Sequence, residues 1–164
     1  MQKIQDFVGK DLIWKRKWFS RKYELTCDEK LIAQIDWPKA FRAYAVVESA
    51  EGQWEIKRRG YWRYKYSIYK KDTEILEATF LRSWDTILTF SNGTVYRFDR
   101  AVLAPDRIWR TSNNTPLIRY FARIWYIMQI EPEALKIKEL SLLAILGIYL
   151  IFEEAGDIIA KAQR

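Results

Sequence analysis

The strongest constraint on the fold is a run of large apolar residues near the end of the chain, LSLLAILGIYLIF at positions 140–152. At about 100° per residue these side chains fall on every side of a helix, so the helix has no polar face and must be enclosed by protein or by lipid. The run rises only about 20 Å, short of a hydrocarbon layer of about 30 Å. Glu153, Glu154 and Asp157 follow it. We therefore predict a central apolar helix at residues 139–154, buried in the core, and a tail at 155–164.

Short strands account for most of the chain before this run. Aromatic residues make up 16% of the sequence, and their bulky flat side chains suit a pleated sheet. Asn92 and Gly93 predict a two-residue hairpin turn with positive φ at both positions, which makes its strands antiparallel. Residues 118–130 fit helical spacing in part, but their β-branched and aromatic content favours a strand. Strand-like runs lie at residues 21–27, 31–37, 43–48, 54–56, 62–68, 74–81, 87–91, 94–99, 107–111 and 118–130.

A barrel can enclose the apolar helix. A strand of six or seven residues also spans about 20 Å, and a barrel of more than eight strands can hold a helix along its axis. The 164 residues fit a single domain. We therefore predict a mainly β fold, a closed antiparallel β-barrel of about twelve strands enclosing a hydrophobic C-terminal α-helix. Residues 1–17 would be a basic lead-in, residues 18–138 the barrel strands, and the protein a monomer.

The order of elements resembles the tubby C-terminal-like group, which includes tubby proteins, phospholipid scramblases and LURP-one-related proteins. The resemblance covers residues 18–154 and is carried by YEL at 23–25, LIA at 31–33, GQWEI at 52–56, NG at 92–93 and LLAILGIYL at 142–150. It implies a closed barrel of about twelve strands around a hydrophobic helix. In that group tubby domains bind phosphoinositide headgroups through basic side chains, and scramblases act at membranes with calcium. No motif carries those residues over to this chain, and no acidic loop resembles a calcium site.

The composition excludes most catalytic chemistry. The chain has no histidine and a single cysteine, which removes Ser-His-Asp and Cys-His catalysis and most zinc sites. Glycine-rich nucleotide loops are also missing from the sequence. Glu153 and Glu154 point about 100° apart on a helix and are expected to be a solvated helix end. We expect a non-enzymatic protein without cofactor or metal, in which Cys27 is a structural thiol.

The electrostatic balance favours an acidic partner. The net charge is +7, and a basic surface attracts anionic lipid, nucleic acid or phosphorylated ligands. MQKIQD at the start contains no apolar signal core, and one cysteine suits a reducing compartment. We expect a cytoplasmic protein that is peripheral where it meets a membrane.

The candidate binding surfaces are two clusters of basic and aromatic residues, at positions 14–22 and 57–63. Three interpretations of them stay open. Anionic membrane lipid or phosphoinositide is one partner that such clusters attract. A structural or protein-interaction role, with the cations as solvated edges that deter strand aggregation, is the second. Single-stranded nucleic acid is disfavoured, because Trp62, Tyr64 and Tyr66 are assigned to the core face and cannot stack on bases. The candidate anion- and lipid-binding residues are Lys15, Arg16, Lys17, Arg21, Lys22, Arg58 and Arg59.

Leu146 tests whether the apolar helix is buried. We expect Leu146→Asp to abolish folding, because a carboxylate in an apolar core has no compensating partner. The far-UV circular dichroism spectrum and the elution volume of the purified variant measure this. A stable, monomeric and fully folded Leu146→Asp variant would contradict a buried helix.

Overall fold

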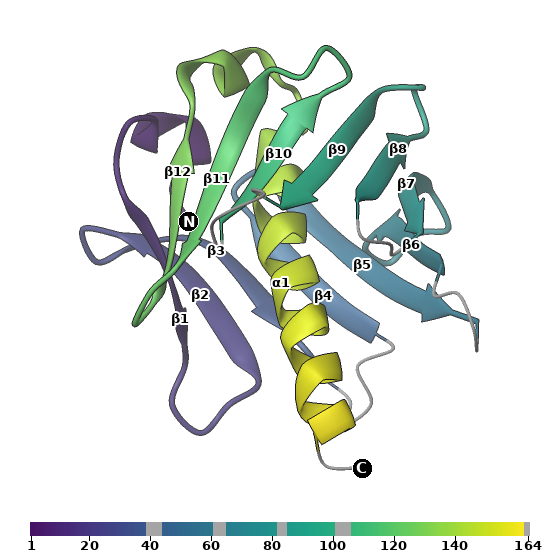
Figure 1. Cartoon of the computed structure of the whole chain (residues 1–164), viewed down its shortest axis with the longest axis horizontal. Coiled ribbons are helices and arrows are strands. Elements are labelled where there is room, and N and C mark those ends of the chain that lie inside the picture. Colours follow the sequence, from purple (N-terminus) through teal and green to yellow (C-terminus); the bar gives the residue numbers. More distant parts are fainter. Residues whose placement is uncertain (39–43, 61–64, 82–84, 101–105, 163–164) are drawn as a thin grey trace.

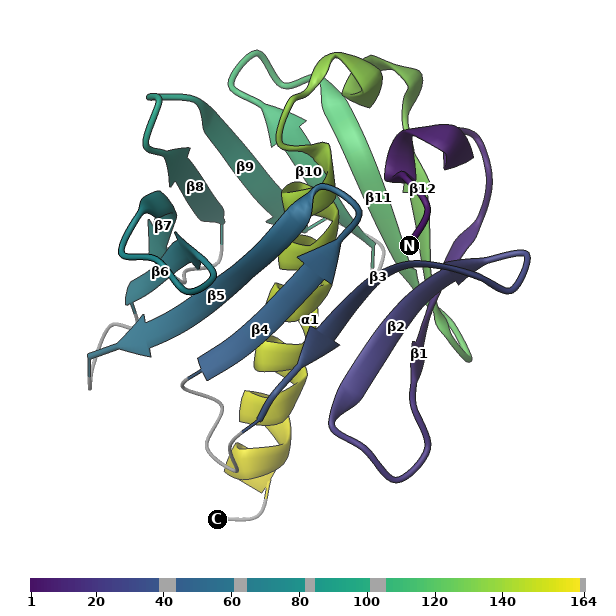
Figure 2. The same ribbon diagram turned by 180° about the vertical axis from the view of Figure 1, so that it is seen from behind.

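The structure, a computed structural model, describes residues 1–38, 44–60, 65–81, 85–100 and 106–162. Within these residues twelve antiparallel strands close into a barrel in which strands consecutive in sequence are neighbours and β1 pairs with β12 (Figures 1 and 2). The predicted fold class is confirmed. The strands are β1 (Leu12–Arg16), β2 (Lys22–Cys27), β3 (Lys30–Asp36), β4 (Tyr44–Ser49), β5 (Gly52–Arg59), β6 (Lys65–Lys70), β7 (Leu76–Leu81), β8 (Thr86–Phe90), β9 (Val95–Arg100), β10 (Arg107–Thr111), β11 (Pro116–Ala122) and β12 (Tyr126–Ile130).

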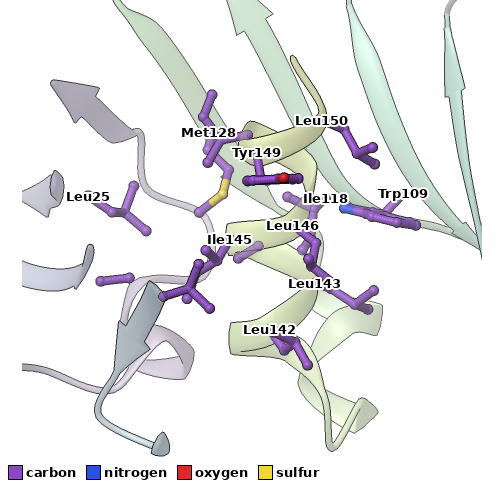
Figure 3. Close-up of a cluster of buried hydrophobic side chains, with 14 of the residues drawn as sticks. Leu25, Trp109, Ile118, Met128, Leu142, Leu143, Ile145, Leu146, Tyr149 and Leu150 are labelled. Carbon is purple, nitrogen blue, oxygen red and sulfur yellow. The ribbon is translucent and has the colours of Figure 1, made fainter. Parts of the chain in front are cut away.

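The helix α1 (Leu140–Ala162) runs through the barrel (Figures 1 and 2). Every residue from 140 to 150 is buried, so the helix is enclosed on all sides as predicted. Figure 3 shows Ile145 on the side of Leu25 and Met128, and Leu143 on the side of Trp109. Side chains of the strands and of the helix together form one core cluster, which fills the interior of the barrel.

Tyr120 of β11 brings the barrel wall unusually close to the helix. Its buried hydroxyl donates to the backbone oxygen of Ala144 at 2.8 Å. A Cβ atom at Gly147 would lie 2.3 Å from Cζ of Tyr120. Glycine at position 147 therefore lets the aromatic ring rest on the helix backbone, which is the reason for this residue inside an otherwise apolar helix.

Both ends of the chain differ from the prediction. The helix extends to Ala162 instead of ending at residue 154, so most of the expected tail is helical. Glu153 and Glu154 do not end the helix, and barrel cations balance their charge, as described below. The lead-in at residues 1–17 already contains strand β1 and the 3-10 helix η1 (Ile4–Phe7). A second 3-10 helix, η2 (Pro132–Lys136), precedes α1.

Residues 118–130 form two strands instead of the single strand predicted. Strand β11 ends at Ala122 and β12 begins at Tyr126, and the two pair in an antiparallel hairpin. Because the turn has three residues, the even-numbered residues of both strands lie on the same face of the sheet. The alternation of apolar residues in the sequence therefore continues across the turn and does not show where β11 ends. A single strand over 118–130 would place Ile124 on the same apolar face as Ile118 and Tyr120, but Ile124 lies in the turn and is 91% exposed.

Two turns also differ in type from the expectation. Residues 91–94 connect β8 and β9, and only Gly93 of the Asn92 and Gly93 pair has positive φ, at 88°. The amide of Gly93 donates to Phe90 O at 2.9 Å, as in a type I turn that ends in a bulge. The two-residue turn with positive φ at both positions is instead Asp28 and Glu29, at 49° and 64°.

The alternation within strands holds with local exceptions. In β6 the inward residues Tyr66 and Ile68 are buried and Lys65 is exposed, as predicted. Trp62 and Tyr64 lie outside the described residues. In β3 a bulge places both Ile32 and Ala33 in the core, because an inserted residue shifts the pleat by one position.

Gly147 tests the close packing of helix and wall. We expect Gly147→Ala to lower the free energy of unfolding by about 1–3 kcal/mol, although alanine favours a helix by about 1 kcal/mol. In a Tyr120→Leu background, which removes the ring, the same substitution should be neutral or stabilising. Urea unfolding of the four proteins measures both effects. A Gly147→Ala variant as stable as its parent with Tyr120 in place would refute this packing.

Candidate functional site

Five of the seven predicted cations lie together on one hairpin. Lys15 and Arg16 end β1, Lys17 and Arg21 lie in the turn, and Lys22 begins β2. We call these five residues the basic hairpin. Lys22 is half-buried and the others are exposed. The hairpin projects from the end of the barrel at which the chain's C-terminus lies (Figure 1).

Two acidic residues accompany the basic hairpin. Lys17 Nζ lies 3.5 Å from Glu24 Oε1, and Lys22 Nζ lies 3.4 Å from Asp36 Oδ2. Ion pairs that are this open to solvent contribute at most about 1 kcal/mol. They orient the lysines without removing the positive potential of the hairpin, which keeps an excess of three cations over the two carboxylates.

The turn of this hairpin presents two aromatic side chains to solvent. Trp18 is 86% exposed and Phe19 is fully exposed. Phe19 also has a left-handed backbone, with φ of 55°, which costs a bulky residue on the order of 1 kcal/mol. The turn is closed by Lys17, whose amide donates to Lys22 O at 2.9 Å. Neither aromatic residue contributes to the core, so the fold does not account for them.

The turn between β11 and β12 lies beside the basic hairpin and was missed by sequence reasoning. Its residues Arg123, Ile124 and Trp125 are exposed, and we call them the second tip. Lys15 Nζ lies 5.5 Å from the ring centre of Trp125, within the range of a cation–π contact. The one sequence signal that could have placed a turn here is length, because thirteen residues exceed the usual strand of 3–10.

The structure separates Arg58 and Arg59 from the basic hairpin. Both lie on β5, which is separated from β2 by β3 and β4. Arg59 is exposed. The side chain of Arg58 is 24% exposed, and its Nη1 lies 3.5 Å from Oε2 of the buried Glu153. Arg58 therefore has a structural partner inside the barrel.

Glu153 and Glu154 do not form the solvated helix end that was expected. Glu153 is buried and accepts a hydrogen bond from the Tyr66 hydroxyl at 3.0 Å. Glu154 is half-buried, and Arg107 of β10 donates to it at 2.9 Å. The two carboxylates diverge as predicted, but each meets a cation of a different strand. They tie the helix to β5 and β10.

A cleft of about 350 Å³ opens at the N-terminal end of α1. Two of its acidic residues, Glu51 and Glu139, have partners in the protein. Glu139 accepts hydrogen bonds from Asn92 and from the Tyr96 hydroxyl, each at 3.1 Å. Glu51 accepts from the hydroxyl of Ser141. This network fastens the start of the helix to the surrounding hairpins.

Metal-ligating side chains and the thiol of Cys27 are the other candidates for a functional site. Among the described residues, no group of three or more Cys, Asp or Glu side chains could hold a metal ion. Cys27 is buried, and burial raises the pKa of its thiol, so the thiolate is disfavoured. No helix within the described part of the chain is long and apolar enough to cross a membrane.

Comparison with known proteins gives no relative. No family model, no curated protein and no solved structure matches this chain.

Arg58 and Arg59 form a matched pair for testing which of the two arginines stabilises the fold. We expect Arg58→Met to lower the free energy of unfolding by about 2–3 kcal/mol, because it removes a cation from a buried carboxylate. Arg59→Met should change it by less than about 0.5 kcal/mol. Adding Glu153→Gln to Arg58→Met should restore part of the loss, since the amide oxygen can still accept from Tyr66. Equal stability of the two methionine variants in urea would contradict the structural role of Arg58.

Proposed function

We propose that this protein is a non-enzymatic barrel that docks on anionic membrane lipid through the basic hairpin. The observation that carries the proposal is the gathering of Lys15, Arg16, Lys17, Arg21 and Lys22 around two exposed aromatic residues on one turn. Each cation near an anionic leaflet contributes about 1 kcal/mol of attraction. Trp side chains favour the headgroup layer, where the ring is partly buried and its N–H stays hydrated. A phosphoinositide headgroup concentrates the same phosphate charge, and a cytoplasmic leaflet would supply both.

The second candidate function is a protein-interaction scaffold. Leu81 and Ile87 are cross-strand partners on the outer face of β7 and β8 and are 53% and 54% exposed. Exposed apolar neighbours of this kind suit a protein contact. Nucleic acid is the third candidate, and Tyr66 cannot contribute to it, because its buried ring is stacked on Phe80 and cannot receive a base.

We also propose that the chain is a divergent member of the tubby C-terminal-like group. The proposal is supported by the number and direction of the strands and by the apolar C-terminal helix they enclose. A shared order of elements is evidence of fold, and the binding proposal rests on the surface residues of this chain.

Charge reversal tests the docking proposal. We expect the triple variant Lys15→Glu, Arg16→Glu and Lys17→Glu to bind vesicles of phosphatidylcholine and phosphatidylserine at least about 100-fold more weakly, since it loses about 3 kcal/mol of attraction and adds repulsion. Co-sedimentation measures binding, with and without phosphoinositide. The matched control is Lys3→Glu, Lys30→Glu and Lys138→Glu, which makes the same charge change at exposed lysines away from the hairpin. Equal binding of the two triple variants, or wild-type binding that ignores lipid charge, would remove the proposal.

A further inference from the structure

We propose that the second tip is a membrane anchor that enters the same lipid surface as Trp18 and Phe19, so that two hairpins hold the barrel in one orientation. This inference rests on the proposed function and adds a second binding element to it. The residues that carry it are Ile124 and Trp125, flanked by Arg123.

The second tip exposes apolar side chains that the fold does not use. Ile124 is 91% exposed and Trp125 is 51% exposed. The next residue, Tyr126, turns inward, and its ring lies 5.1 Å from that of Phe152. The boundary between core and surface therefore falls directly before Tyr126. Large apolar side chains beyond such a boundary, bordered by cations, are typical of a surface that meets the lipid interface.

Strand pairing places the two tips on one rim. Trp14 of β1 pairs with Tyr126 of β12, so the end of β1 and the start of β12 lie side by side. Lys15 bridges the tips through its contact with Trp125. Both turns project at the same side of the barrel in Figures 1 and 2. Because the β1–β12 ladder is part of the closed barrel, it holds the bases of the two tips side by side, so one surface can receive both.

This geometry fixes which end of the molecule faces lipid. Phe152, in the C-terminal half of α1, packs on Tyr23 of β2, with ring centres 4.1 Å apart, as well as on Tyr126. The lipid-facing rim is therefore the one next to the C-terminal half of the helix. The turn of Asp28 and Glu29 lies at the opposite end of β2, where Lys10 pairs with Asp28 at 3.5 Å, and it faces away from the lipid surface. Charge and apolar exposure thus favour the same orientation.

Paired serine variants test the second anchor on vesicles of phosphatidylcholine and phosphatidylserine. We expect Trp18→Ser with Phe19→Ser, and separately Ile124→Ser with Trp125→Ser, each to weaken binding at least about tenfold. The control Leu81→Ser with Ile87→Ser removes two exposed apolar side chains from the outer wall and should bind as wild type. Urea unfolding confirms that each variant is folded. A polarity-sensitive dye on a cysteine replacing Ile124, in a Cys27→Ala background, should shift its emission to the blue on vesicles.

The outcomes separate this inference from the proposed function. If the Ile124 and Trp125 variant binds like wild type while the Trp18 and Phe19 variant does not, the second anchor is refuted and docking by the basic hairpin stands. The second anchor is likewise refuted if the dye at position 124 shows no change in emission on vesicles that bind the protein. If the wild type ignores these vesicles, the proposed function fails and the second anchor with it.

Discussion

The fold depends on enclosing a helix that has no polar face. Residues 140–150 of α1 are buried on every side, and such a helix cannot lie on a surface of a protein in water. A ring of twelve strands is wide enough to surround it and is filled by it. Three polar side chains of the helix meet partners in the barrel: Ser141 donates to Glu51, and Glu153 and Glu154 pair with Arg58 and Arg107. The buried part of the helix is thereby held at both of its ends.

Because the helix and the strands share one core cluster inside the barrel, we expect the functional site on the surface. The side chains of the helix and of the strands pack into one core cluster in the interior, and Glu51 and Glu139 at the cleft by the start of α1 are bound by neighbouring side chains. Exposed apolar side chains lie beside the basic hairpin at one rim, among them Trp18, Phe19 and Ile124. These side chains cost solubility, and Phe19 adds backbone strain. The proposed docking on anionic lipid gives these otherwise unexplained features one common cause.

The enclosed helix and the closed barrel could be predicted because their signals are global. The apolar side chains at 140–152 are shielded from water only if the helix is buried on all sides. The alternation of apolar and polar residues recurs in many segments, and strands explain it better than helices do. Local features were less predictable. The helix continues past Glu153 because of Arg58 and Arg107, which are distant in sequence. The turn from Arg123 to Trp125 leaves the even-numbered residues of both β11 and β12 on the same face, so the alternation in the sequence does not reveal the turn. The second tip was therefore missed, whereas the basic hairpin was predicted.

Hydrogen exchange with and without anionic vesicles tests most directly whether α1 is a permanent core while the rim meets lipid. In solution, the amides of residues 143–150 should exchange only through global unfolding, with an opening free energy equal to that of the whole domain. On vesicles they should stay as protected, while the amides around Trp18 and Ile124 should gain protection. Loss of protection along α1 on binding would show that the helix leaves the barrel and would contradict this account.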